Sequence, residues 1–136
     1  MINVATQKLP KEAINELLNR LTDDRWVLGD AVIEFEEKFA KYIGTEYAVS
    51  ICNGTMGLLA VYEALGIRKR TLITTTYTFI ATASVATFLG AKVDFVDVLY
   101  DNACLNPEEV VKKVWKKNNY IVTVVHIFGY PEELMK

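Results

Sequence analysis

From residue 45 onwards the sequence alternates between short apolar runs and stretches of about ten residues with the pattern of helices. The apolar runs are rich in β-branched residues, which favour strands. They cover residues 47–51, 71–75, 93–98 and 120–125. Strands that alternate with helices usually pair in parallel, because each helix carries the chain back to the same edge of the sheet. The sequence therefore predicts an α/β fold, with a mostly parallel sheet flanked by helices.

The periodicity of apolar residues also predicts where the helices lie. They are expected at residues 10–21, 30–43, 55–65 and 78–89, and from Pro107 onwards. We treat residues 1–136 as one α/β domain, in which 1–44 is an N-terminal helical segment and 45–136 forms the βαβ units.

Two of these helices carry clear end signals. Asp30 can cap the second helix, which stops at Gly44. Its apolar face, which we expect to be buried, consists of Val32, Phe35, Phe39 and Tyr42. The last helix opens with Asn106 as a cap and Pro107 at the first helical position.

Composition excludes several classes of function. A net charge of -2 gives no electrostatic reason to expect nucleic-acid binding. No apolar run approaches the ~20 residues that span a bilayer, so we expect no membrane partner. Cys52 and Cys104 have neither metal-ligand spacing nor a CxxC pairing, which predicts no metal site and a reducing, cytoplasmic location.

The turn Asn53-Gly54-Thr55 joins a predicted strand to a predicted helix. The first backbone N–H groups of such a helix are unpaired, and the helix dipole adds partial positive charge there. A phosphate would be held well at this point, with Thr55 adding a hydroxyl and Gly54 allowing close approach. The alternative is a turn that only caps the helix. The sequence of the turn matches neither a Walker loop nor a dinucleotide-binding fingerprint.

Two further residues follow predicted strands, at the edge where open α/β sheets bind ligands. Phe79 comes after the second strand and can stack on a flat ring, or pack as a core residue under a loop. His126, the single histidine, ends the last strand and is either functional or structural. The loop around Trp26 is an interface or substrate loop. No set of catalytic residues can be assembled.

Together these segments resemble the N-terminal part of the DegT/DnrJ/EryC1/StrS aminotransferases, which are pyridoxal-phosphate (PLP) sugar aminotransferases. The matching motifs, in chain order, are Leu28-Gly29, Phe35-Glu36, Tyr47-Ala48-Val49, Asn53-Gly54-Thr55, Tyr77-Thr78-Phe79-Ile80-Ala81-Thr82, Gly90-Ala91-Lys92-Val93-Asp94-Phe95-Val96-Asp97-Val98 and Val125-His126-Ile127-Phe128-Gly129-Tyr130-Pro131. The resemblance implies that the chain folds as the N-terminal part of the large domain of PLP-dependent transferases of fold type I, the aspartate aminotransferase type.

The resemblance also implies roles for particular residues. Gly54, Thr55 and Met56 fall where the family's helix N-terminus holds the PLP phosphate. Phe79 falls where an aromatic ring stacks on the pyridine, and His126 lies near the cofactor side of the sheet. The loop around Trp26 and Gly29 matches a region that helps to shape the sugar-nucleotide site.

In the family, an Asp that pairs with the pyridine nitrogen and the Schiff-base Lys follow the last matched motif. We therefore expect this chain not to transaminate by itself. The reaction, from an amino acid to a keto sugar nucleotide, would need a second chain that supplies the remaining part. The alternative is a catalytically dead remnant that acts as an oligomeric binding or interaction domain. The expected partners are thus a second copy of the chain or a complementing chain.

The same resemblance predicts a difficulty for the sheet. In the family the first strand pairs with a late strand, and the second and fourth strands here are separated by the strand that bears the Asp. Unpaired strand edges are costly. We predict that the second and fourth strands pair directly, or that another chain fills the gap.

Overall fold

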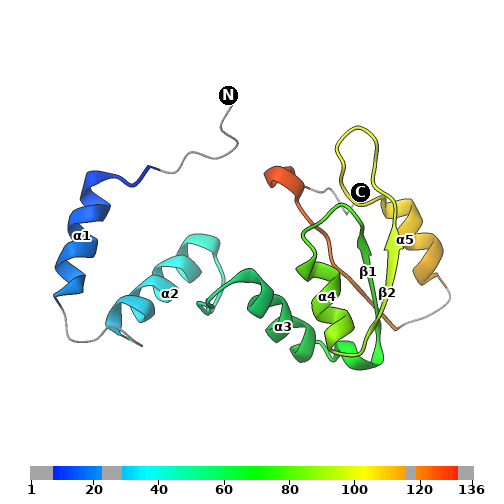
Figure 1. The fold of residues 1–136 in the computed structure, drawn as a ribbon, viewed down its shortest axis with the longest axis horizontal. Helices are drawn as coiled ribbons and strands as arrows, with labels where there is room; N and C mark the ends of the chain where they lie inside the picture. The colour runs from blue at the N-terminus through cyan, green and yellow to red at the C-terminus, as the bar shows by residue number, and fades with distance from the viewer. Residues whose placement is uncertain (1–7, 23–28, 116–118, 132–136) are drawn as a thin grey trace. The chain divides into compact units, whose positions relative to one another are not determined.

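The computed structural model describes residues 8–22, 29–115 and 119–131. The chain divides into two compact units, Met1–Ser50 and Ile51–Lys136. The division falls six residues after the end of the N-terminal helical segment drawn from the sequence at residue 44. Figure 1 shows the elements of both units in chain order.

The first unit contains two of the predicted helices, α1 (Lys11–Leu21) and α2 (Asp30–Ile43). As predicted, α2 stops at Gly44, whose φ of 82° is left-handed and whose N–H donates to the Ala40 carbonyl at 2.9 Å. The prediction that Asp30 caps α2 is wrong. Gly29 occupies the cap position, and Asp30 is the first helical residue.

The apolar face of α2 is exposed, so the prediction that it is buried is wrong. Phe35 is 56% exposed, Phe39 46% and Tyr42 84%, and Val32 is exposed as well. Ala40 is the buried residue of this helix. Amphipathic spacing determines which side chains share a face, whereas burial requires a second surface. The described residues of this unit do not supply one.

Residues 47–51 form no strand, which contradicts the first predicted strand. A strand exists by hydrogen bonding to a neighbouring strand, and no such neighbour occurs among the described residues. Instead, the Glu36 carboxylate accepts hydrogen bonds from the Ser50 N–H and hydroxyl, both at 2.7 Å. These bonds, the backbone N–H first, lower the pKa of Glu36.

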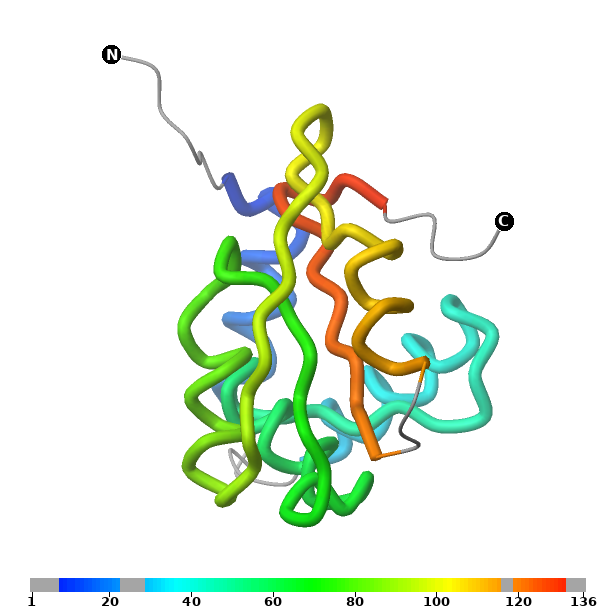
Figure 2. The backbone as a smooth tube through the Cα atoms, turned by 90° about the vertical axis from the view of Figure 1, so that its right-hand side faces the viewer, coloured from blue at the N-terminus to red at the C-terminus, as the bar shows by residue number. Residues whose placement is uncertain are grey.

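The second unit is built around a parallel sheet of three strands, β1 (Thr71–Thr75), β2 (Lys92–Val96) and β3 (Tyr120–Val122). The order is β2-β1-β3 (Figure 2). Residue Thr71 of β1 lies opposite Lys92 on one side and Tyr120 on the other. The second and fourth predicted strands therefore pair directly, which confirms that prediction.

Helices cover both faces of this sheet (Figure 1). On one face, α3 (Gly54–Ala64) and α4 (Ala81–Phe88) enclose a core that includes Leu72. On the other face α5 (Pro107–Val114) covers the neighbouring Ile73. Successive side chains of a strand point to opposite faces, so β1 buries residues on both sides. Leu72 and Ile73 are each 0% exposed.

Element ends differ from the predictions where side chains bond to the backbone. The α4 helix begins at residue 81 rather than 78. The Thr75 hydroxyl oxygen accepts the Tyr77 N–H at 3.0 Å, and the hydroxyls of Thr78 and Thr82 lie 2.8 Å apart. These contacts hold residues 76–80 as a turn. By contrast, α5 begins as predicted, with Asn106 as its cap.

Candidate functional site

The N-terminus of α3 presents two backbone donors. Asn53 is the N-cap, with extended backbone (φ -167°, ψ 166°), and its side-chain oxygen accepts the Met56 N–H at 3.0 Å. The N–H groups of Gly54 and Thr55 have no acceptor among the described residues. Because the helix dipole makes this end positive, these two donors and the Thr55 hydroxyl suit an anion. Met56 differs from the sequence interpretation, since its N–H is already bonded.

Glycine matters in two ways in this turn. A Cβ added to Gly54 would meet no protein atom within 4 Å, so the space in front of the helix end is open. A Cβ added to Gly57 would overlap the Ile51 side chain. The Ile51 side chain therefore packs closely against Gly57 near the start of α3, where any larger residue would displace it.

Thr55 and Met56 also line a hollow of about 480 Å³ between α3 and α4. The other lining residues are Leu59, Ser84, Val85 and Phe88. Because most of these side chains are apolar, this hollow suits the hydrocarbon part of a ligand rather than its charge. Met56 thus lines this hollow with its side chain, whereas its N–H is bonded to Asn53.

Phe79 and His126 lie at the carboxyl edge of the sheet. Phe79 follows β1 and is 74% exposed, so the alternative of a core phenylalanine is wrong. His126 follows β3 and is exposed. Because β1 and β3 are parallel neighbours, both residues are at the same edge. Whether these two residues and Gly54, Thr55 and Met56 bind a cofactor stays a prediction.

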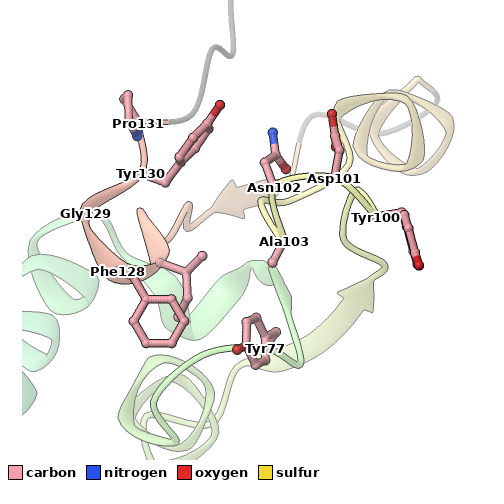
Figure 3. Close-up of a pocket in the computed structure, with 10 residues that line it drawn as sticks. Tyr77, Tyr100, Asp101, Asn102, Ala103, Phe128, Gly129, Tyr130 and Pro131 are labelled. Atoms are coloured by element: carbon pink, nitrogen blue, oxygen red, sulfur yellow. The ribbon is translucent and has the colours of Figure 1, made fainter. Parts of the chain in front are cut away.

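A second hollow, of about 510 Å³, opens at this edge (Figure 3). It is lined by Tyr77 after β1, by residues 100–103 after β2 and by residues 127–131 after β3. The rings of Tyr77 and Phe128 meet edge to face, with centroids 6.5 Å apart. None of the five predicted site residues lines it. The sequence analysis missed this hollow, which the aromatic residues after the strand ends could have indicated.

Two residues of this hollow have left-handed backbone although they are not glycine. The φ angle is 57° at Ala103 and 52° at Phe128. Such backbone is strained for residues with a Cβ and persists only where the surroundings hold it. The turn containing Phe128 is the 3-10 helix η2 (Ile127–Gly129).

Some predicted features lie elsewhere. Trp26 is outside the described residues, and Gly29 belongs to the first unit. Within the described ranges, no group of three or more His, Cys, Asp and Glu side chains is arranged to hold a metal ion. In the same ranges, no helix has the length and apolar character needed to cross a membrane.

Residues 7–136 match the model of the DegT/DnrJ/EryC1/StrS aminotransferase family. The chain belongs to this family. The resemblance inferred from the sequence is therefore confirmed, and it extends over nearly all of the chain.

Relatives in this family include transaminases of sugar nucleotides. A UDP-4-amino-4,6-dideoxy-N-acetyl-beta-L-altrosamine transaminase of Campylobacter jejuni is 39% identical over 101 residues, which are 74% of this chain and 27% of that protein. The crystal structure of 3-amino-5-hydroxybenzoic acid synthase is 28% identical, with a TM-score of 0.86 over 95% of this chain and 34% of that one. This chain spans about a third of the length of its relatives.

A third neighbour bears on the cofactor. The Escherichia coli GDP-4-keto-6-deoxy-D-mannose-3-dehydratase, solved with bound hydrated PLP, has a TM-score of 0.86 over 97% of this chain and 36% of that one, at 22% identity. At this identity the likeness concerns the fold. The likeness confirms the predicted fold class. In that protein the fold holds PLP, which agrees with the PLP dependence of the family.

Proposed function

We propose that this chain supplies the phosphate-holding part of a PLP site in an enzyme that transfers an amino group from an amino acid to a keto sugar nucleotide. One observation carries the proposal. The N–H groups of Gly54 and Thr55 are open at the positive end of an 11-residue helix, in a chain of a PLP-dependent family. The sugar-nucleotide transaminases among the relatives support the substrate class.

Each predicted site residue has a distinct task in this proposal. The Gly54 and Thr55 N–H groups and the Thr55 hydroxyl donate to the phosphate. Phe79, exposed at the carboxyl edge, covers one face of the pyridine ring, and His126 approaches from the same edge. Met56 contributes its side chain to the apolar hollow. When bound, PLP would supply the electron sink on which amino transfer depends.

The remaining groups come from outside these 136 residues. They are the lysine that would hold PLP covalently and the carboxylate that pairs with its ring nitrogen. Either a longer polypeptide or a second chain can supply them. This division agrees with the share of about a third that the chain takes of its relatives' length.

Cys52 offers a direct test of phosphate binding. Its thiol is exposed and immediately precedes Asn53, whereas Cys104 is buried, so alkylation of the folded chain reports on Cys52. The probe is pyridoxine 5′-phosphate, which has no aldehyde and so cannot react with surface lysines. We expect it to protect Cys52 from alkylation. Pyridoxine, which lacks the phosphate, should not protect it.

Two variants of Thr55 separate the effect of its hydroxyl on binding from the effect of its side-chain shape. Thr55→Val removes the donor and keeps the volume, and should weaken binding of pyridoxine 5′-phosphate by about tenfold. Thr55→Ser keeps the donor and should bind as the wild-type chain does. Equal protection of Cys52 by pyridoxine and its phosphate ester would contradict the proposal.

Completion of the site needs a separate experiment. The chain is mixed with a polypeptide that carries the remaining part of a family member, and amino transfer from glutamate to a keto sugar nucleotide is measured. Activity that appears only in the mixture supports a split arrangement. Association without amino transfer would instead favour a binding domain. If the two chains show no association and no activity, the split-enzyme arrangement is excluded.

A further inference from the structure

A partly buried hydroxyl network, centred on the buried Tyr62, connects the elements that carry the predicted site residues. Tyr62 of α3 is 1% exposed, and its hydroxyl donates to the Thr82 carbonyl of α4 at 3.0 Å. The same hydroxyl lies 3.0 Å from the Thr123 hydroxyl, just after β3. A phenol has one proton, so when Tyr62 donates to Thr82, Thr123 has to donate to Tyr62.

The network continues from both partners of Tyr62. Thr82 Oγ1 lies 2.8 Å from Thr78 Oγ1, in the turn that carries Phe79. The Thr123 carbonyl accepts a hydrogen bond of 3.0 Å from the buried Thr74 hydroxyl. The Thr123 N–H donates to the Ile73 carbonyl at 2.9 Å. The segment that leads to His126 is thus held to the end of β1.

Tyr62 also has a suitable place along α3. It follows Thr55 by seven residues, or about two helical turns, so both lie on one side of the helix. Apolar contacts are not directional and leave a helix free to shift slightly, whereas hydrogen bonds fix its rotation. Among the described side chains of α3, Tyr62 is the one that bonds to both α4 and the segment after β3.

We propose that Tyr62 is a positioning residue, which through Thr82 and Thr123 aligns the phosphate-binding end of α3 with Phe79 and His126. The proposal rests on the proposed function for the site that it aligns. Burial raises the pKa of the Tyr62 phenol, so the hydroxyl keeps the proton that it donates.

The test removes a hydroxyl group of the network and keeps the rest of the side chain. Tyr62→Phe keeps the buried ring and removes the oxygen, and Thr123→Val removes the partner hydroxyl at similar volume. Either change should weaken binding of pyridoxine 5′-phosphate by about three- to tenfold, although neither residue is placed in contact with the ligand. Thr123→Ser keeps the hydroxyl and should restore wild-type affinity. The pair Tyr62→Phe and Thr123→Val should not be additive.

Two controls separate positioning from stability. Tyr120→Phe removes a phenol for which the described residues offer no hydrogen-bond partner, and should leave affinity unchanged. Ile67→Val trims the same core without touching the network. It should lower the Tm without changing affinity, even where the loss of Tm equals that of Tyr62→Phe.

A second readout needs no ligand. Amide hydrogen exchange should accelerate in Tyr62→Phe at Tyr77 and Thr123 together, and stay unchanged there in Ile67→Val. If the wild-type chain binds the phosphate ester but Tyr62→Phe binds equally well with unchanged exchange, the positioning role is wrong and the proposed function stands. If the wild-type chain does not bind, the proposed function fails, and coupled exchange at the two sites decides the positioning role.

Discussion

The two units of the chain use similar sequence patterns with different results. In Ile51–Lys136, the central strand β1 has both faces covered, and Ile73 is 0% exposed. In Met1–Ser50, the helix α2 has an equally regular apolar face, yet Phe35 on that face is 56% exposed, and Ile33 beside it is 55% exposed. The comparison shows that periodicity determines which side chains share a face, and that a separate surface determines whether the face is buried.

The largest expected effect tests this difference with one substitution at two places. Ile73→Ala should destabilise the chain by about 3 kcal/mol, because it leaves a cavity between the sheet and α5. Ile33→Ala should change stability by less than about 0.5 kcal/mol, since the side chain is largely exposed and alanine favours helices. Urea unfolding of both variants measures the two values. Equal losses would mean that α2 is buried against a surface in solution.

Helix caps differ between the units as well. Asn53 and Asn106 cap α3 and α5 with their side chains, whereas the cap residues of α1 and α2, Pro10 and Gly29, make no side-chain hydrogen bond to the helix. Asn53→Ala and Asn106→Ala should each cost about 1 kcal/mol, read from urea unfolding.

Added phosphate should separate these two variants. In Asn53→Ala the Met56 N–H becomes open to the anion, so phosphate should recover part of the lost stability. In Asn106→Ala the loss should be the same with and without phosphate. If phosphate affects both variants alike, the start of α3 is not a special anion site.

Strained backbone also belongs to the second unit. Among the described residues, non-glycine residues with positive φ are Ala103 and Phe128, whereas the first unit uses Gly44. Ala103→Gly should stabilise the chain by about 0.5 kcal/mol, because relief of the left-handed strain outweighs the greater freedom of glycine when unfolded. The control Ala60→Gly, within α3, should cost about 1 kcal/mol. Thermal unfolding gives the sign of the stability change in both variants. A loss of stability in Ala103→Gly would contradict the interpretation that the backbone at Ala103 is strained.

The smallest effect concerns the segment before residue 51. Because the folded pKa of Glu36 is lowered, its bonds to Ser50 contribute stability above the ordinary carboxyl pKa. That contribution is lost as the pH falls through the lowered value. Hydrogen exchange at the Ser50 N–H, followed between about pH 6 and pH 2, should show this loss of protection. In Glu36→Gln the exchange should be weakly protected throughout and show no such transition.

Local signals predicted most of the secondary structure. The helix end at Gly44 and the Asn106-Pro107 start were correct because each depends on neighbouring residues. The strand at 47–51 and the buried face of α2 were wrong because both depend on a surface remote in sequence. The start of α4 was missed because threonine hydroxyls hold the turn before it.

The site shows the same division. The strand–turn–helix pattern pointed to the Gly54 and Thr55 donors, which depend on adjacent residues. It did not reveal that Asn53 would occupy the Met56 N–H, since the side chain of a cap can point either to the helix or to solvent. Nor did it reveal the network of Tyr62, Thr82 and Thr123, which depends on three elements meeting in space.

The central claim is that the open N–H groups of α3 hold a phosphate, and two variants of Gly54 test it most directly. Gly54→Pro removes one N–H donor at the first helical position, where proline fits and where the extended Asn53 suits a following proline. Gly54→Ala keeps the donor, and its Cβ meets no protein atom within 4 Å. Titration with pyridoxine 5′-phosphate should show affinity at least about tenfold weaker in Gly54→Pro than in Gly54→Ala. Equal affinity of the two variants would contradict the claim.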